Sequence, residues 1–411
     1  MRRIIPSAMT PSAVDPRSVR RLLVVRPRFL GDLCLTLPVL DALRALCPQA
    51  RIAYMAEEGP AALLEDDPRV DERIVVRRAP GPAGTAALAA RLRRFRPDVA
   101  LDLFCNPRTA VWCALSGARV RVGYPHKGWR SALYTHHARP RTLSAVGFHL
   151  ASLEALGWEA PGGPWSGLGP ARGPAPRPRL HLAPAAREEA ARALESLGVP
   201  RDATLVGFHP GARWPTRRWA PERFTQLAQR FLESRRDGVA LVTGGPGEED
   251  LVHQVAAPLG GRAREIAGWP LRRFVALQSL CTAFVCGDTG PLHTAAAAGA
   301  PTLGLMTRNR PAMFFPYSEE DGHRAHTARV ECSPCHRDTC DDLRCLARLT
   351  PGGAWLALEG MLARAGRPAE TPPAPPPAGG PFRGVLPRGF PRPEARAARP
   401  QPGGEPWRRS S

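Results

Sequence analysis

The stretch FVCGDTGPLHTAAAAGAP, residues 284–301, predicts a buried strand that ends in a Gly-Asp-Thr-Gly turn and continues into a short alanine-rich helix. Gly299 and Pro301 are expected to end that helix. A helix start presents unpaired backbone N–H groups and the positive end of the helix dipole, so the turn is suited to binding an anion. The alternative is a plain N-cap, because Asp, Thr and Gly are common at helix starts.

Length and composition indicate a globular protein of two ordinary domains, since the chain has 411 residues and 43% of them are hydrophobic. No apolar run approaches the ~20 residues that span a bilayer, so we expect no transmembrane helix. The N-terminal stretch 1–21 contains basic residues but no continuous apolar segment of signal-peptide length. These features predict a cytoplasmic protein.

The chain is strongly basic, with 57 Lys and Arg against 37 Asp and Glu and a net charge of +20. Such a charge favours anionic partners, which include nucleotide diphosphates, phosphorylated sugars, anionic lipids and nucleic acids. Aromatic residues make up only 6% of the chain, and they do not alternate with basic residues as in a stacking platform for single strands. We therefore expect no nucleic-acid partner.

The first part of the chain alternates apolar strands with helical segments, which predicts a parallel sheet covered by helices. The expected strands lie at 20–27, 51–57, 72–77 and 97–104. Pro38 interrupts the first helical segment, so either the helix is kinked there or it begins near Thr36.

A second series of strands and helices follows a segment rich in Pro and Gly that is suited to a linker. The fold class is therefore α/β, with two facing Rossmann-like domains and a cleft between them. The expected division is a disordered N-terminal arm (1–19), an N-terminal Rossmann-like domain (20–165), a linker (166–180), a C-terminal Rossmann-like domain (181–366) and a disordered, proline-rich basic tail (367–411).

Four loops carry most of the polar residues of interest, and each follows a predicted strand. Their sequences are RPRFLGD after 20–26, HPGARWPTRRW after 203–208, GGPGEED after 239–243 and GDTGPLH after 283–286. Ligands of such sheets bind at the carboxyl ends of the strands, so we expect the four loops to converge on one cleft.

Ten cysteines are unevenly spread, and six of them lie singly in apolar segments as small buried residues do. The other four lie in the turn-rich stretch CSPCHRDTCDDLRC, at Cys332, Cys335, Cys340 and Cys345. Their spacing would suit a small structural metal or Fe–S site or redox-labile disulfides, and a reduced, metal-free cluster is the alternative. A closed four-thiolate site has no open position for chemistry, so we expect a structural role in either case.

Three motifs together resemble glycosyltransferase family 9, the lipopolysaccharide heptosyltransferases, over residues 20–365. They are FLGDLCLTLPVLDALRALCPQARIAYM, FHPGARWPTRRWAPERF and FVCGDTGPLHTAAAAGAP, in this order. The resemblance implies a GT-B fold and an inverting transfer of L-glycero-D-manno-heptose from ADP-heptose to the inner core of lipopolysaccharide. It also implies an acceptor-binding N-terminal domain, a nucleotide-sugar-binding C-terminal domain, no catalytic metal and no required cofactor.

The departing ADP gains negative charge, which a cation and a helix start can neutralise without a metal. Arg217 or Arg218, with the backbone N–H groups of Thr289 and Gly290, is expected to hold the diphosphate. Family members commonly have Lys where Arg217 stands, so here a planar guanidinium group replaces the compact ammonium group of lysine.

The resemblance assigns three further donor-binding residues. Glu248 lies where the family has a carboxylate for the ribose hydroxyls, and an exposed acid at a helix start is the alternative. Asp288 is expected either to meet sugar hydroxyls or to fix the turn. His293 belongs to the same motif and has a structural histidine as its alternative.

Asp32 is the candidate catalytic base, because inversion by direct displacement needs a base on the acceptor side and the family proposes this aspartate. A helix N-cap is the alternative. Gly31 lets substrate approach closely. Arg28 replaces the small or polar residues usual in the family, which indicates an acceptor with phosphate or carboxylate.

Two other classes share the α/β pattern, but each lacks support in the sequence. A dinucleotide-dependent oxidoreductase or epimerase would carry G-x-G-x-x-G after the first strand, and this chain does not. A non-catalytic nucleotide-sugar-binding protein that had lost the base would lack the carboxylate of Asp32.

The partners that the resemblance implies are a nucleotide-sugar donor and a lipid-linked core saccharide, with loose contact at the inner face of the cytoplasmic membrane. A related family 9 enzyme with another donor or acceptor is the closest alternative.

Overall fold

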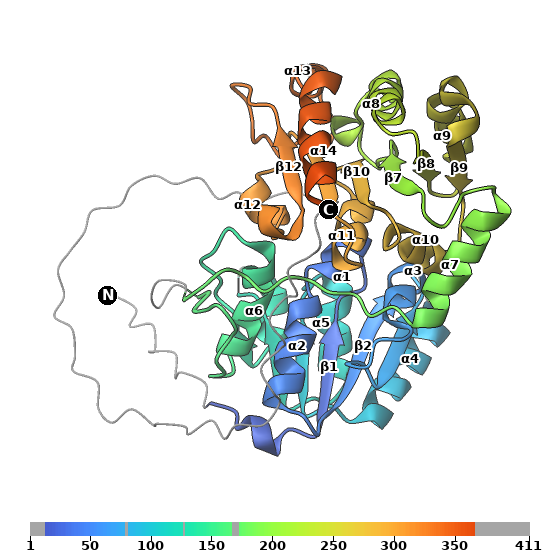
Figure 1. Cartoon of the computed structure of the whole chain (residues 1–411). Coiled ribbons are helices and arrows are strands. Elements are labelled where there is room, and N and C mark those ends of the chain that lie inside the picture. The colour runs from blue at the N-terminus through green and yellow to red at the C-terminus, as the bar shows by residue number, and fades with distance from the viewer. Residues whose placement is uncertain (1–12, 79–80, 126–127, 167–171, 366–411) are drawn as a thin grey trace. The chain divides into compact units, whose positions relative to one another are not determined.

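The computed structural model describes residues 13–78, 81–125, 128–166 and 172–365, and they form two six-stranded parallel sheets (Figure 1). Residues 1–12 of the expected arm (1–19), part of the linker and the basic tail lie outside these described residues. Residues 13–19 of that arm are described, and they contain a 3-10 helix at Pro16–Ser18 and the buried Val19. No helix in the described ranges has the length and apolar character needed to cross a membrane.

The first sheet has the strand order β3-β2-β1-β4-β5-β6. Its strands are β1 (Arg21–Val25), β2 (Arg51–Glu57), β3 (Glu72–Val76), β4 (Val99–Asp102), β5 (Val120–Gly123) and β6 (His136–His137). The helices of this part are η1 (Pro16–Ser18), α1 (Leu30–Cys34), α2 (Leu37–Leu46), α3 (Glu58–Ala61), η2 (Ala62–Leu64), α4 (Gly81–Phe95), α5 (Pro107–Leu115), η3 (Gly128–Leu133) and α6 (Ala145–Glu154).

The second sheet has the order β12-β11-β10-β7-β8-β9. Its strands are β7 (Thr204–His209), β8 (Gly238–Gly244), β9 (Ala263–Ala267), β10 (Ala283–Gly287), β11 (Thr302–Met306) and β12 (Arg324–Thr327). The helices of this part are α7 (Pro184–Ser196), η4 (Pro215–Arg217), α8 (Pro221–Ser234), α9 (Glu249–Ala256), η5 (Ala257–Arg262), α10 (Leu271–Gln278), α11 (Gly290–Ala297), α12 (Pro311–Phe314), η6 (Glu319–Asp321), α13 (Arg344–Ala347) and α14 (Pro351–Ala365).

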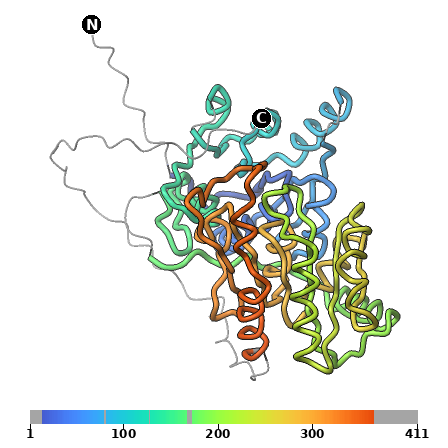
Figure 2. Tube along the Cα trace, turned by 90° about the horizontal axis from the view of Figure 1, so that it is seen from above, coloured from blue at the N-terminus to red at the C-terminus, as the bar shows by residue number. Residues whose placement is uncertain are grey.

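Strand β10 is buried along its whole length and sends alternate side chains to opposite faces of the second sheet. Val285 packs in a cluster that includes residues of α8 and α14, and Figure 2 shows these two helices side by side. Phe284 and Cys286 pack on the other face with residues of α7, α10 and α11. A strand that is covered on both faces has a continuous run of apolar residues, which is why β10 could be predicted from the sequence.

The break near Pro38 is resolved in favour of a new helix. Helix α1 ends at Cys34, and α2 begins at Leu37 with Thr36 as its N-cap residue and Pro38 in its first turn. Proline is tolerated there because the N–H group it lacks has no partner within the helix.

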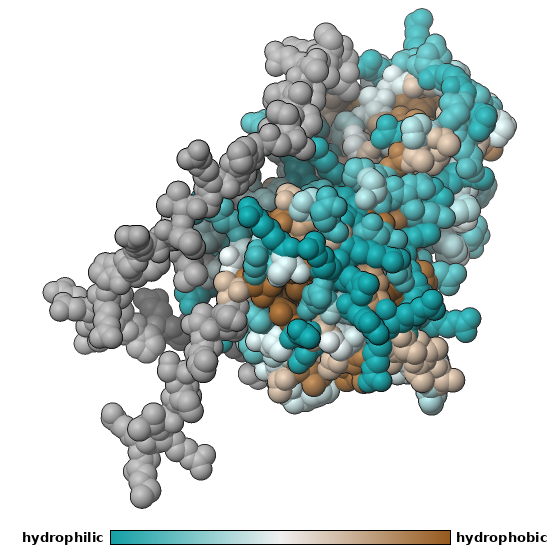
Figure 3. Space-filling view, turned by 90° about the horizontal axis from the view of Figure 1, so that it is seen from below, coloured by the Kyte–Doolittle hydropathy of each residue, from teal (hydrophilic) through white to brown (hydrophobic). Residues whose placement is uncertain are grey.

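The molecular surface drawn in Figure 3 is largely hydrophilic, with smaller hydrophobic patches between the polar side chains.

Candidate active site

Strand order places the candidate loops at the centre of each sheet. In the second sheet β7 and β10 are neighbours, and the chain moves outward from them in opposite directions. In the first sheet β1 and β4 have the same relation. Such a switch point opens a crevice at the carboxyl ends of the strands, so the loops after β1, β7 and β10 all lie beside one.

The turn after β10 has the form that the sequence predicts. Gly287 ends the strand, Thr289 has extended backbone angles and Gly290 is the first residue of α11. No side chain at the N-cap position accepts a hydrogen bond from the helix start, and the Thr289 hydroxyl donates to the Gly287 carbonyl at 3.4 Å. The plain N-cap is therefore not observed, and the helix start keeps the character of an anion site.

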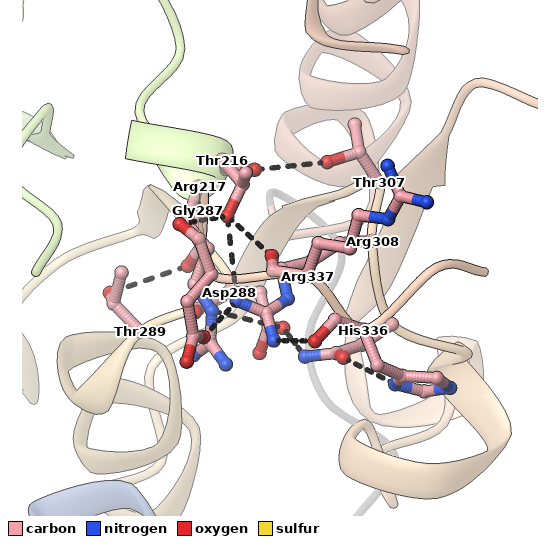
Figure 4. Close-up of polar contacts among 11 residues, drawn as sticks. Thr216, Arg217, Gly287, Asp288, Thr289, Thr307, Arg308, His336 and Arg337 are labelled. Carbon is pink, nitrogen blue, oxygen red and sulfur yellow. Dashed lines mark hydrogen bonds and ion pairs between the residues drawn. The ribbon is translucent and has the colours of Figure 1, made fainter. Parts of the chain in front are cut away.

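Arg217 lies against this turn. Its Nη1 donates to the Asp288 carbonyl oxygen at 2.7 Å, and its Nε lies 4.0 Å from the Asp288 carboxylate (Figure 4). A Cβ at Gly287 would lie 2.6 Å from the Arg217 carbonyl oxygen, so only glycine allows the two segments to come so close. Arg218 instead donates from Nε to the Ala212 carbonyl at 2.7 Å and braces its own loop. Of the two candidate cations, Arg217 is the one in contact with the turn.

Glu248 lies at the carboxyl end of β8, where it is the N-cap residue of α9. Its Oε2 accepts from the Gly245 N–H at 2.8 Å and lies 3.9 Å from His209 Nε2. Burial lowers the pKa of His209 to about 4, against an opposing effect of the Glu248 carboxylate, so His209 is neutral near pH 7. A Cβ at Gly211 would lie 2.3 Å from Glu248 Oε2, so a side chain at this position would displace the carboxylate.

Asp32 is the third residue of α1, whose N-cap residue is Phe29. Its Oδ1 accepts from Arg26 Nη2 at 2.6 Å, and about a third of its side chain is exposed (35%). Arg26, at the end of β1, is itself buried and donates from Nη1 to the Leu103 carbonyl at 2.6 Å. The Asp32 carboxylate is therefore oriented by an arginine and open to solvent, which is not the geometry of an N-cap.

Helix α1 packs directly against the start of α11, and Figure 1 shows the two side by side. A Cβ at Gly31 would lie 2.5 Å from His293 Cδ2, and one at Gly290 would lie 3.2 Å from Leu30 Cβ. His293 is buried, its Nδ1 lies 3.2 Å from the Tyr317 hydroxyl, and burial lowers its pKa. The close approach at Gly31 is thus to His293, which brings the helix of Asp32 against the predicted diphosphate helix.

Two arginine side chains lie against the ring of Phe29, three residues before Asp32. The Arg28 guanidinium carbon lies 5.3 Å from the centre of this ring and that of Arg213 lies 5.2 Å from it. The ring is itself 44% exposed. The structure therefore places Arg28 on the same loop as the candidate base, stacked on an aromatic ring.

The four clustered cysteines are free thiols, and Cys332 is exposed. Within the described ranges, no group of three or more His, Cys, Asp or Glu side chains is arranged to hold a metal ion. Hydrogen bonds attach this segment to the loop after β11: the Ser333 hydroxyl donates to the Thr307 carbonyl at 2.6 Å, and His336 Nδ1 lies 3.0 Å from Asn309 Oδ1.

Several residues of the site were missed by sequence reasoning, namely Arg26, His209, Thr216, Arg308, Asn309 and His336. Arg26 and Asn309 carry a usable signal, since each follows a buried strand and lies at its carboxyl end. His336 carries no such signal, because its partner is 27 residues away in the chain.

Comparisons with known proteins identify the family to which this chain is similar. Residues 85–345 match the family described as glycosyltransferase family 9 (heptosyltransferase). The chain is 26% identical over 324 residues to lipopolysaccharide heptosyltransferase 2 of Salmonella typhimurium, covering 75% of this chain and 88% of that protein. It is 27% identical over 380 residues to lipopolysaccharide heptosyltransferase 1 of Pseudomonas aeruginosa, covering 83% and 98%.

The fold also matches solved structures. The structure of Escherichia coli ADP-heptose lipopolysaccharide heptosyltransferase II aligns with a TM-score of 0.67 at 22% identity, covering 84% of this chain and 99% of that one. The predicted α/β architecture of two Rossmann-like halves, of GT-B type, is confirmed.

Proposed function

The chain belongs to glycosyltransferase family 9, and we propose that it transfers heptose from ADP-heptose to the inner core of lipopolysaccharide with inversion at the anomeric carbon. The curated relatives named above support this proposal, because both are lipopolysaccharide heptosyltransferases matched over most of their length.

The contact between Arg217 and the turn at 288–290 carries the proposal. In the transfer, the bond from the anomeric carbon to the diphosphate oxygen breaks, and ADP leaves with the electron pair. A guanidinium and the uncapped start of α11 lie together where such a charge can be stabilised. We propose that they hold the diphosphate without a metal ion, and that Glu248 accepts hydrogen bonds from the ribose hydroxyls.

Asp32 is the proposed base. An acceptor hydroxyl would attack the anomeric carbon from the face opposite the diphosphate, which inverts the configuration, while its proton passes to the Asp32 carboxylate. The 2.6 Å contact with Arg26 fixes the orientation of this carboxylate. Its exposure leaves it accessible to an acceptor.

The proposed acceptor is a lipid-linked core saccharide, which the N-terminal half would bind and Arg28 would contact through a phosphate or carboxylate group. The C-terminal half would bind the donor. A cytoplasmic location at the inner face of the membrane follows from such an acceptor, and the charge of +20 favours an anionic lipid surface.

A donor screen by calorimetry tests the proposal. ADP-heptose is compared with UDP-sugars, GDP-sugars and NAD, and product formation is then measured on a core acceptor that lacks heptose. Selective binding of ADP-heptose followed by transfer is expected. Binding of NAD without binding of ADP-heptose would overturn the proposal.

A further inference from the structure

The cysteine-rich segment, residues 332–345, is hydrogen-bonded to residues that adjoin Arg217 and Asp288 (Figure 4). The Thr216 hydroxyl, next to Arg217, donates to the Arg337 carbonyl at 3.0 Å. On the other side, Asn309 lies between Asp288 and His336. The segment therefore contacts the neighbours of both Arg217 and Asp288.

The side chains of Asn309 and Asp288 are hydrogen-bonded to each other, and both are almost fully buried. Its Nδ2 donates to Asp288 Oδ2, so its Oδ1 is left as an acceptor. His336 Nδ1 lies 3.0 Å from that Oδ1 and must therefore carry the proton of the hydrogen bond. The donors run in one direction, from His336 through Asn309 to the carboxylate.

The backbone of His336 is held in place as firmly as its side chain. Its φ of 54° is in the left-handed region, which residues other than glycine seldom adopt without local contacts. Arg308, also buried, donates from Nη2 to the His336 carbonyl at 2.6 Å and from Nη1 to the Asp338 carboxylate. The imidazole is thereby fixed on Asn309.

We propose that Asn309 and His336 are positioning residues for the Asp288 carboxylate, which they orient toward the hydroxyls of the donor sugar. This inference rests on the proposed function. A carboxylate repels a diphosphate but accepts hydrogen bonds from vicinal hydroxyls, so Asp288 suits the sugar end of the donor. The diphosphate end belongs to Arg217, which is bonded to the backbone carbonyl of the same residue.

This division predicts a selective effect. His336→Ala and Asn309→Ala should weaken binding of ADP-heptose about tenfold, because the sugar contact needs an oriented carboxylate, while the affinity for ADP changes by less than about twofold. His336→Gln should recover much of the loss, since an amide N–H can donate to Asn309 Oδ1. Both affinities are measured by calorimetry for each variant.

Matched surface pairs provide the controls. His253 lies 2.9 Å from Glu265 and Gln254 donates to Glu222 at 3.1 Å, both on exposed parts of the second half. His253→Ala and Gln254→Ala should leave both affinities at the wild-type value. His336 is exposed and its alanine variant is expected to fold, which keeps the test valid if Asn309→Ala unfolds.

The outcomes separate this inference from the proposed function. Failure of the wild-type protein to bind ADP-heptose would contradict the proposed function and, with it, the inference. Tight wild-type binding with an unchanged ratio of ADP-heptose to ADP affinity in His336→Ala would overturn the inference alone. An equal loss for both ligands would also overturn it, because the network would then shape the diphosphate site.

Discussion

Asp32 pairs with Arg26 instead of the backbone N–H groups of its helix, and this decides how the Gly-Asp motif is interpreted. An aspartate in the first turn of a helix is most often explained by capping or by the helix dipole. Here the carboxylate is anchored by a buried arginine that has its own backbone partner, and it remains partly exposed. This geometry supports the proposed role of Asp32 as the base.

Asp32→Asn tests this assignment. The amide keeps the size of the side chain but cannot accept a proton, so turnover should fall by about two to four orders of magnitude while donor affinity stays near wild type. Asp41→Asn is the control, because Asp41 is a half-exposed aspartate on α2 that also pairs with a buried arginine, with its Oδ1 2.8 Å from Arg69 Nη1. Turnover of Asp32→Asn within a few-fold of wild type would contradict the role of base.

Gly31 has a packing role that the motif alone does not reveal. Because an added Cβ would lie 2.5 Å from His293 Cδ2, Gly31→Ala should destabilise the protein by about 1–3 kcal/mol. In the double variant with His293→Ala the clash is removed, so the two losses should be clearly less than additive. Urea unfolding of the four proteins in this cycle measures the coupling, and strictly additive losses would show that α1 and α11 do not meet in solution.

The central strands and their loops could be predicted because each strand is buried on both faces and each loop contains glycine, proline or charged residues. Strands β1, β2, β7, β8, β10 and β11 all read as apolar runs. Strands β6, β9 and β12 lie at sheet edges and are partly exposed, so their sequences lack this signal. The exception is β3, which the sequence predicts at 72–77 although it is a partly exposed edge strand.

The contacts between loops could not be predicted in the same way. Arg26 and Asp32 are only six residues apart, yet the geometry of their contact depends on the turn between them. His336 and Asn309 come from different segments whose meeting depends on the folded second sheet. The sequence indicates which residue types lie at the carboxyl ends of strands, and folding decides which of them pair.

His323, immediately before β12, predicts how stability depends on pH. It is buried with its ring 5.2 Å from that of Tyr317, and burial and Arg177 lower its pKa to about 4. The unfolded chain binds this proton at its usual pKa of about 6.5, so stability is complete above that pH and falls as the pH drops toward 4.

His323→Phe removes this titration, and Nδ1 of His323 has no hydrogen-bond partner within the described ranges that would be lost. The loss of unfolding free energy between pH 8 and pH 5 should therefore be about 2 kcal/mol smaller in the variant than in wild type. Urea titrations at the two pH values measure it. An identical loss in both proteins would mean that His323 is charged, or accessible, in the folded state.

The end of the expected linker is hydrogen-bonded to both halves of the chain. Arg69 Nη2 donates to the Arg179 carbonyl at 2.8 Å, and the Leu180 N–H donates to the Ala297 carbonyl at 2.8 Å. The described part of the expected linker, 172–180, contains no helix or strand, as its Pro and Gly content predicts. The domain boundaries stay a prediction, and the expected tail from 367 onward lies outside the described residues.

The central claim is that Arg217 and the start of α11 together hold the diphosphate of the donor. The most direct measurement is the affinity for ADP, with single-turnover rates on ADP-heptose, in Arg217→Ala, Arg217→Lys and Gly290→Val. Arg217→Ala should lose affinity and turnover, because its charge interacts most strongly as ADP leaves, and Arg217→Lys should recover much of both. Gly290→Val should weaken ADP binding with Arg217 intact. A Cβ at this position would lie 3.2 Å from Leu30 Cβ, so the valine side chain would displace the start of α11, whose backbone N–H groups are proposed to bind the diphosphate. Wild-type affinity for ADP in both Arg217→Ala and Gly290→Val would contradict the account and place the diphosphate elsewhere.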